Sequence, residues 1–204
     1  MIGKTLSTCL SLILLLIISV VNADEGTLRI TMKTNQGDIK IDLYMDKAPI
    51  TAGNFLTLVE GEHLDGGSFY RVVTYENDNG NPRIEVIQGG LGDEVQSPFE
   101  PVSHETTGQT GILHKDGVIS MARGDVGTAS SEFFICVGDQ PGLDYGEVRN
   151  PDGQGFAAFG QVVSGMDVVR RILQLPADGA SDSDYTRGQI LTDPVKIISV
   201  RRTN

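Results

Sequence analysis

The amino-acid sequence predicts a mainly β domain, either a sandwich or a barrel, with helices covering its open ends. Three observations predict it. Short segments in which apolar and polar residues alternate recur along the chain, only two segments have helical periodicity, and no internal repeat of about 20 to 50 residues is present. Periodicity alone does not distinguish the sandwich from the barrel.

The first two strands are expected to form a hairpin. Apolar residues alternate with polar ones over residues 28–33 and again over residues 39–44, and Asn35-Gln36-Gly37 provides the turn between them. Later segments rich in β-branched and aromatic residues lie between glycine-rich links. The further strands are expected at residues 68–73, 84–90, 117–122, 132–137, 156–162 and 195–200.

Two helices are expected, at residues 49–60 and 165–174. Pro49 opens the first helix, where its missing N–H costs little, and Gly61 ends it. Ser164 is expected to cap the second helix, with Asp167 three residues later, and the apolar residues that follow recur at helical spacing.

The N-terminal segment has the pattern of a secretory signal peptide. One lysine precedes an apolar run over residues 10–21, and Val21-Asn22-Ala23 offers small or neutral residues at the point of cleavage. The run is shorter than the roughly 20 residues of a membrane-spanning helix, and an uncleaved anchor is the alternative. We therefore expect a signal peptide over residues 1–23 and one exported domain over residues 24–204, with no membrane attachment after cleavage.

Charge and composition disfavour several functions. The net charge is −11, and removal of Lys4 with the signal makes it −12, which argues against nucleic acid as a partner. His63, His104 and His114 lack the spacing of metal ligands, and no phosphate- or dinucleotide-binding motif indicates a cofactor. Cys136 is the single cysteine of the expected mature domain, and its apolar neighbours predict a buried, unreactive thiol.

Two polar residues interrupt the apolar strands at 68–73 and 84–90. Arg71 lies between Phe69-Tyr70 and Val72-Val73, and Gln88 precedes two glycines that let another backbone approach closely. Taken alone, each is a surface arginine or a glutamine before a turn. Taken together, they can face one shallow apolar pocket.

Three ordered blocks of the sequence resemble the cyclophilin-type peptidyl-prolyl isomerases. Phe69-Tyr70-Arg71 followed by Gln88-Gly89-Gly90 is similar to the family's Phe-x-Arg and Gln-Gly-Gly pattern. Residues 119–123 with 131–136 are similar to its Ser-Met-Ala and Ser-Gln-Phe-Phe-Ile segments, and residues 155–162 to its Phe-Gly-x-Val strand. The resemblance extends over residues 28–200, and the three blocks together are more specific than any one of them.

The resemblance implies a fold, a reaction and a site. The fold is an eight-stranded antiparallel barrel capped by the two helices, and because side chains fill such a barrel, the site should lie on its outer face. Arg71 matches the family's catalytic arginine, Gln88 the glutamine that binds the substrate backbone, and Phe134 the floor of the proline pocket. The other substrate-binding residues that it implies are Phe69, Val86, Met121, Ala122, Arg123, Glu132, Leu143 and Phe156.

The sequence also departs from the family pattern. Glu85 stands where many members have a pocket phenylalanine, Glu132 where they have glutamine, and Phe156 where they have histidine. Because residues 74–83 are an insertion relative to that pattern, Ile84 or Tyr75 are alternatives to Glu85 as the apolar wall of the pocket.

The chain contains no tryptophan. In the family, tight binding of the drug ciclosporin implies a tryptophan at the edge of the pocket, and Gly142 occupies the corresponding position here. We therefore expect weak inhibition by ciclosporin.

Two functions are consistent with these residues. The first is a peptidyl-prolyl cis-trans isomerase that acts on X-Pro bonds of exported polypeptides and assists their folding. The second is a binding module or holdase that keeps the pocket without the activity. We favour the enzyme, because Arg71 is retained. The expected partners are proline-containing unfolded or flexible polypeptides, the expected state is a monomer, and the longer segment between Arg71 and Gln88 resembles bacterial members, which favours the periplasm.

Overall fold

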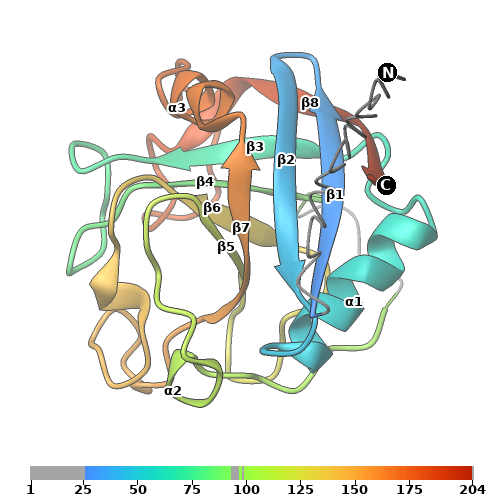
Figure 1. Ribbon diagram of the computed structural model, residues 1–204. Coiled ribbons are helices and arrows are strands. Elements are labelled where there is room, and N and C mark those ends of the chain that lie inside the picture. The colour runs from blue at the N-terminus through green and yellow to red at the C-terminus, as the bar shows by residue number, and fades with distance from the viewer. Residues whose placement is uncertain (1–25, 93–96, 98, 204) are drawn as a thin grey trace, which may run out of the picture.

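Eight antiparallel strands close into a barrel in the order β1-β2-β7-β5-β6-β4-β3-β8 (Figure 1). The computed structural model describes residues 26–92, 97 and 99–203. The expected signal peptide and its cleavage point lie outside the described residues. The mainly β fold predicted from the sequence is thus confirmed, and closure of the sheet decides between the sandwich and the barrel.

The elements follow the predicted order with small changes of boundary. The strands are β1 (Thr27–Thr34), β2 (Gly37–Tyr44), β3 (Ser68–Val73), β4 (Val86–Gly90), β5 (Val118–Met121), β6 (Phe133–Cys136), β7 (Ala157–Ser164) and β8 (Ile190–Arg202). The helices are α1 (Pro49–Glu60), α2 (Thr107–Thr110) and α3 (Met166–Leu173), and a 3-10 turn spans Pro141–Leu143. Strand β8 is much longer than the predicted 195–200, because it pairs with both β3 and β1 and closes the barrel.

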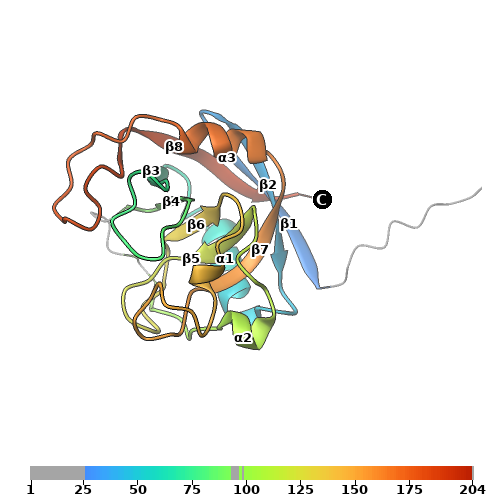
Figure 2. The same cartoon turned by 90° about the vertical axis from the view of Figure 1, so that its left-hand side faces the viewer.

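Helix α1 packs on β2, β7 and β8, and α3 packs on β2, β3 and β4 (Figures 1 and 2). The prediction that Ser164 caps α3 is wrong. Gly165 is the N-cap residue, at a φ of 94°, and no side chain caps the helix. A Cβ atom at Gly165 would lie 2.4 Å from the backbone oxygen of Asp38, so glycine is required for the close approach to β2. None of the helices in the described ranges is long and apolar enough to cross a membrane.

Large aromatic side chains fill the interior of the barrel. Phe55 from α1, Phe69 from β3, and Phe133 from β6 are fully buried. The ring centroids of Phe133 lie 5.4 Å from Phe55 and 5.6 Å from Phe69, both in edge-to-face geometry. Since the interior is occupied in this way, a ligand site has to lie outside the barrel.

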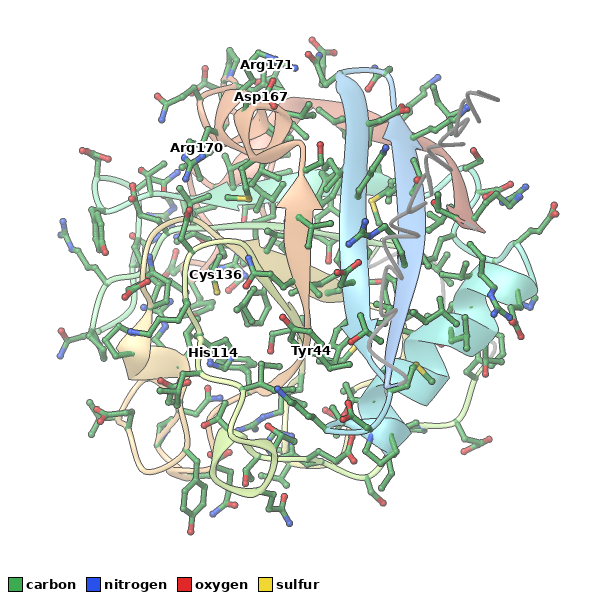
Figure 3. The ribbon with its side chains drawn as sticks, in the orientation of Figure 1. Tyr44, His114, Cys136, Asp167, Arg170 and Arg171 are labelled. Carbon is green, nitrogen blue, oxygen red and sulfur yellow. The ribbon has the colours of Figure 1, made fainter. Side chains whose placement is uncertain are left out.

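A second apolar cluster covers the outer face of β3, β4 and β6. Its buried members are Val73, Ile84, Val86, Phe134, Cys136 and Leu143. The residues between them in the strands belong to the interior cluster, because successive side chains point to opposite faces. Cys136 is fully buried (Figure 3), and this burial raises the pKa of its thiol well above the ordinary value. This cluster is the apolar surface on which the candidate site is built.

A β-bulge in β3 decides which of its side chains reach the outer face. Phe69 pairs with Gly89, whereas Arg71 pairs with the preceding residue of β4, Gln88, so Tyr70 is the extra residue. The bulge directs Phe69 into the barrel and Arg71 outward. Strict alternation would have placed the two side chains on the same face.

Candidate active site

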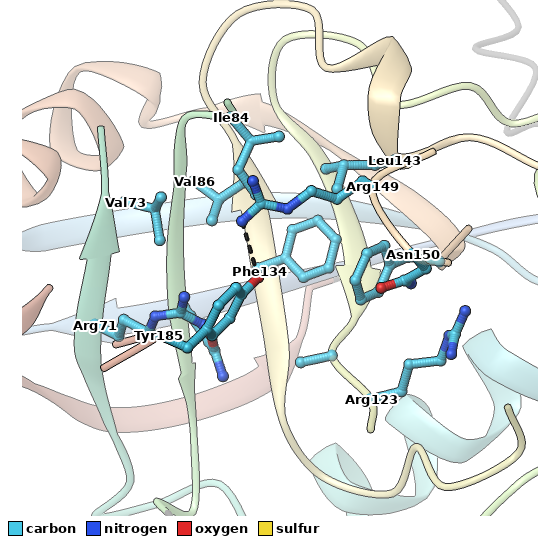
Figure 4. Close-up of a pocket in the computed structure, with 13 residues that line it drawn as sticks. Arg71, Val73, Ile84, Val86, Arg123, Phe134, Leu143, Arg149, Asn150 and Tyr185 are labelled. Atoms are coloured by element: carbon cyan, nitrogen blue, oxygen red, sulfur yellow. Dashed lines mark hydrogen bonds between the residues drawn. The ribbon is translucent and has the colours of Figure 1, made fainter. Parts of the chain in front are cut away.

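A cavity of about 240 Å³ lies against the outer apolar cluster (Figure 4). Strands β3, β4 and β6 form one side of it, and the loops that follow β3, β5 and β6 and precede β8 form the rest. Its lining residues are Arg71, Val73, Ile84, Val86, Gln88, Ala122, Arg123, Phe134, Leu143, Arg149, Asn150, Phe156 and Tyr185.

Two neutral amide side chains hold Arg71 at the edge of the cavity. Its Nη1 donates to Oε1 of Gln88 at 2.8 Å, and its Nε and Nη2 donate to Oε1 of Gln189 at 2.9 and 2.6 Å. Gln189 is fully buried and donates from Nε2 to the carbonyl oxygen of Asn77 at 2.8 Å, which fixes its orientation. A guanidinium has five N–H groups, so two remain outside these three bonds. The sequence prediction that Arg71 and Gln88 meet is therefore confirmed.

Arg71 is also the cation of the cavity that carries no carboxylate partner among the described residues. Arg123 pairs with Asp152 at 2.8 Å, and Arg149 pairs with Asp78 at 2.7 Å. Burial lowers the pKa of Arg71 from its ordinary value of 12.5, and the nearby hydroxyl of Tyr185 opposes this shift. Arginine nevertheless stays charged near neutral pH, because its ordinary pKa is so high. The cavity thus presents one uncompensated positive charge.

The floor of the cavity is Phe134. The ring of His114 stacks beneath it with a centroid distance of 5.9 Å, and Phe156 meets it edge-on at 5.3 Å. His114 is held by two buried hydrogen bonds, one between Nδ1 and Oδ1 of Asp144 at 2.7 Å and one between Nε2 and Oγ of Ser120 at 3.0 Å. A floor with supports on both sides keeps its shape when a ligand binds.

A chain of hydrogen bonds connects Arg71 to Glu132. Gln88 donates from Nε2 to the Tyr70 hydroxyl at 2.9 Å, and that hydroxyl donates to Glu132 at 2.7 Å. Burial raises the pKa of the Glu132 carboxyl, although the hydrogen bond from Tyr70 and those from two backbone N–H groups oppose the shift. Glu132 lines a second hollow of about 270 Å³, which shares Gln88, Ala122 and Arg123 with the first.

Most of the site residues expected from the sequence come together here. The cavity is lined by Arg71, Val86, Gln88, Ala122, Arg123, Phe134, Leu143 and Phe156, and the adjoining hollow by Glu132. Phe69 and Met121 do not line either hollow. Both side chains are buried in the interior cluster, Phe69 because of the bulge in β3 and Met121 because it alternates with Ala122. Three residues were candidates for the apolar wall of the pocket. Ile84 lines the cavity, whereas Glu85 and Tyr75 do not.

Four residues of the site carried no signal in the sequence. Gln189 lies just before β8, outside the strands and helices that the sequence predicts. Arg149, Asn150 and Tyr185 lie in long polar loops, whose sequence does not indicate where they return to the barrel. Only the three-dimensional arrangement brings Gln189 to Arg71 and the other three side chains to the cavity.

The lining also limits the chemistry of the cavity. Among the described residues that line it, there is no serine, cysteine, histidine, aspartate or glutamate that could act as a nucleophile or a general base. What remains is an apolar slot with a fixed cationic hydrogen-bond donor. The fold and the site thus define a class of protein, a filled β-barrel with an apolar cavity on its outer wall and an arginine at the edge of that cavity.

Comparisons with known proteins identify this class. The family described as cyclophilin type peptidyl-prolyl cis-trans isomerase/CLD matches residues 29–202. A peptidyl-prolyl cis-trans isomerase of Acinetobacter baylyi is 34% identical over 174 residues, which cover 84% of each chain. Peptidyl-prolyl cis-trans isomerase B of Escherichia coli is 36% identical over 147 residues, 70% of this chain and 82% of that one.

The fold has a counterpart among solved structures. A crystal structure of a cyclophilin type peptidyl-prolyl cis-trans isomerase of Cryptosporidium parvum superposes with a TM-score of 0.65 at 18% identity, covering 87% of this chain and 98% of that chain. This chain therefore belongs to the cyclophilin-type peptidyl-prolyl cis-trans isomerase family. The family and the isomerase class that the sequence predicts are confirmed.

Proposed function

We propose that this chain accelerates the rotation of X-Pro bonds in exported polypeptides and that Arg71 is its catalytic residue. The observation that carries the proposal is the position of Arg71, which is held by two neutral amides at the edge of an apolar cavity and has two N–H groups outside those bonds. Phe134 and its neighbours supply a slot for the proline ring.

The mechanism follows from the reason why the uncatalysed reaction is slow. Amide resonance keeps the X-Pro bond planar, with a barrier of about 18 to 20 kcal/mol, so that exchange takes about 10 to 100 s. When the bond twists, the prolyl nitrogen becomes pyramidal and its lone pair becomes a hydrogen-bond acceptor. An N–H of Arg71 directed at that lone pair stabilises the twisted state more than either planar state, which is what catalysis requires.

The other residues position the substrate. Gln88 uses one N–H for Tyr70, and the second N–H of its amide is available for the substrate backbone. The apolar side chains around Phe134 exclude water from the ring, so that the hydrogen bond from Arg71 acts in a medium of low polarity. No proton transfer or covalent intermediate is involved.

The experiment compares Arg71→Ala and Arg71→Lys with the unchanged chain on a short X-Pro peptide, by NMR exchange or a protease-coupled assay. We expect Arg71→Ala to lower kcat/KM by at least about a hundredfold, the scale of one lost preorganised donor. Arg71→Lys should recover little, because a mobile ammonium lacks the planar fork of arginine. Arg170→Ala, at an exposed arginine on α3, is the matched control and should leave the rate unchanged.

If Arg71→Ala keeps the full rate while circular dichroism and peptide binding stay the same, Arg71 is not catalytic and the mechanism is wrong. If the unchanged chain binds proline peptides without accelerating their exchange, the protein is a holdase of the cyclophilin fold.

The proposal that the substrates are exported polypeptides rests on the signal-peptide pattern of residues 1–23 and on bacterial relatives such as that of Acinetobacter baylyi. We propose a periplasmic monomer whose chain starts at or near Asp24. N-terminal sequencing of native protein tests the cleavage, and recovery of an intact Met1 in the membrane fraction contradicts it. Sedimentation of the purified protein tests the monomer.

A further inference from the structure

A tyrosine from the loop before β8 forms one side of the cavity. Tyr185 lines it, and its ring lies over the guanidinium of Arg71, with 5.3 Å from Cζ to the ring centroid (Figure 4). The residue as a whole is 49% exposed and lines the cavity, so a bound ligand can reach its side chain. The ring of Tyr185 is therefore an aromatic surface of the cavity next to Arg71.

A buried ion pair holds the Tyr185 side chain in place. Its hydroxyl accepts a hydrogen bond from Nη2 of Arg149 at 2.9 Å, drawn as the dashed line in Figure 4. Arg149 forms a bidentate pair with Asp78 at 2.7 and 2.9 Å, and both side chains are almost completely buried. The ring therefore contacts two guanidinium groups, one of which is fixed by a carboxylate.

The backbone around Tyr185 is held as firmly as its side chain. Asn79, from the insertion after β3, donates from Nδ2 to the carbonyl oxygens of Tyr185 at 3.2 Å and Arg187 at 3.0 Å. Asn77, from the same insertion, donates to the carbonyl oxygen of Gly188 at 2.9 Å. Two loops that are about a hundred residues apart in the sequence thus fix one ring at the cavity, and a contact surface fixed in advance loses little entropy on binding.

We propose that Tyr185 is a specificity-determining residue, which selects peptides that carry an aromatic side chain next to the proline. The inference rests on the proposed function, because it assumes that the proline ring occupies the slot over Phe134. A side chain adjacent to that proline then reaches the exposed part of the Tyr185 ring. An aromatic group gains most there, since pairs of aromatic rings contribute beyond the area that they bury.

The charges around Tyr185 favour the same class of ligand. Arg149 is neutralised by Asp78, and under the proposed function the charge of Arg71 is engaged by the X-Pro bond, so neither is left to attract a separate acidic side chain to this position. This corner of the cavity therefore offers a substrate an aromatic surface and not a free charge.

The test measures kcat/KM on three peptides, Ala-Ala-Pro-Ala, Ala-Phe-Pro-Ala and Ala-Ala-Pro-Phe, with the unchanged chain and with Tyr185→Ala, Tyr185→Leu and Tyr185→Phe. The readout is the ratio of the better phenylalanine peptide to the all-alanine peptide. A general loss of catalysis through Arg71 lowers both terms and leaves this ratio unchanged. We expect the ratio to fall about three- to tenfold in Tyr185→Ala and Tyr185→Leu and to persist in Tyr185→Phe.

Tyr75→Ala is the matched control, because Tyr75 is 44% exposed, lies in the inserted loop and does not line the cavity. Its ratio should equal that of the unchanged chain. An unaltered ratio in a folded Tyr185→Leu chain overturns the inference, and so does an unchanged chain with no preference for phenylalanine.

Failure of the proposed function gives a different result. In that case the unchanged chain accelerates none of the three peptides. The affinities of the same peptides for the same variants, measured by titration, then test the role of Tyr185 alone. We expect the affinity ratio of the phenylalanine peptide to the all-alanine peptide to fall in Tyr185→Ala and Tyr185→Leu. An unaltered affinity ratio in a folded Tyr185→Leu chain contradicts the inference.

Discussion

The catalytic role proposed for Arg71 depends on the residues that surround it. Its partners, Gln88 and Gln189, are neutral, so they orient the guanidinium without cancelling its charge. A carboxylate in either position would orient the group equally well, but it would compete with the substrate for the same positive charge. The buried amide of Gln189 is therefore expected to be a positioning residue.

Replacing Gln189 tests this role. Gln189→Leu removes the acceptor of two Arg71 bonds, so the guanidinium loses its fixed direction, and we expect kcat/KM to fall by up to about a hundredfold. Peptide affinity should change little, because the apolar slot is untouched. Gln140→Leu is the control, since Gln140 is also a buried amide but donates to the Val137 carbonyl oxygen. It should lower stability without this loss of rate. Equal rates for Gln189→Leu and the unchanged chain would exclude the positioning role.

Glu132 gives the stability a defined pH dependence. Burial raises the pKa of its carboxyl above the ordinary 4.5, so the folded chain holds this proton more tightly than the unfolded chain. Its contribution to the free energy of unfolding is therefore fully present below the unfolded pKa and decreases as the pH rises through the folded pKa.

Glu132→Gln removes that dependence. We expect the free energy of unfolding of the variant, minus that of the unchanged chain, to be larger at about pH 7.5 than at about pH 4.5. Urea unfolding of both chains at the two pH values measures it, and acidic groups common to both chains cancel in the difference. The same difference at both pH values would contradict the raised pKa.

At the scale of elements, the loop between β3 and β4 supports the site. It places Asp78 under Arg149 and Ile84 in the wall of the cavity. Burial alone would raise the pKa of Asp78, but hydrogen bonds from Arg149 and from the backbone N–H groups of Gly80 and Ile84 outweigh it and lower the pKa. Hydrogen bonds to the Asp78 carboxylate thus fix this loop to Arg149.

The same loop explains why ciclosporin should inhibit weakly. A Cβ atom at Gly142 would lie only 2.5 Å from Cγ of Pro82, so a larger residue at this position, such as the tryptophan that the family resemblance implies for tight drug binding, would meet the loop. We expect loss of such a ring to cost more than tenfold in affinity. Titration of the isomerase activity with the drug measures it. Gly142→Trp alone should not restore binding while Pro82 is present, and nanomolar inhibition of the unchanged chain would contradict this account.

Local patterns and long-range contacts differed in how well the sequence indicated them. Helix α1 matched its predicted bounds, because proline at its start and glycine after its end are local signals. Helix α2 was not predicted, since four residues are too few for periodicity, although Thr106 and Gln109 form a capping box. The bulge at Tyr70 depends on pairing with β4, and no property of residues 68–73 alone indicates it.

At the scale of the whole molecule, closure of the barrel protects its strands from solvent. Strand β6 lies between β4 and β5, and Cys136 in it is fully buried. The barrel has no open edge from which this strand could separate without breaking a ladder on each side.

Thiol labelling tests this protection. In a Cys9→Ser chain, we expect the labelling of Cys136 to be slow in native conditions and to rise with urea in parallel with unfolding measured by circular dichroism. The high pKa of the thiol slows the reaction further, because the thiolate is the reactive form. Rapid labelling well below the unfolding transition would show local opening of the wall. The unfolded chain in urea serves as the reference for full reactivity.

The strands of the barrel wall carry two separate apolar surfaces. One face of β4 and β6 faces the aromatic interior, and the other carries the apolar floor of the cavity. Because neighbouring positions along β3 and β4 face opposite ways, substitutions at Val73 or Val86, and at Ile84 in the loop before β4, can alter which peptides are preferred while the interior stays as it was. A library restricted to those positions would explore new clients at small cost to the scaffold. A library at Phe69 or Phe133 would mainly yield chains that do not fold.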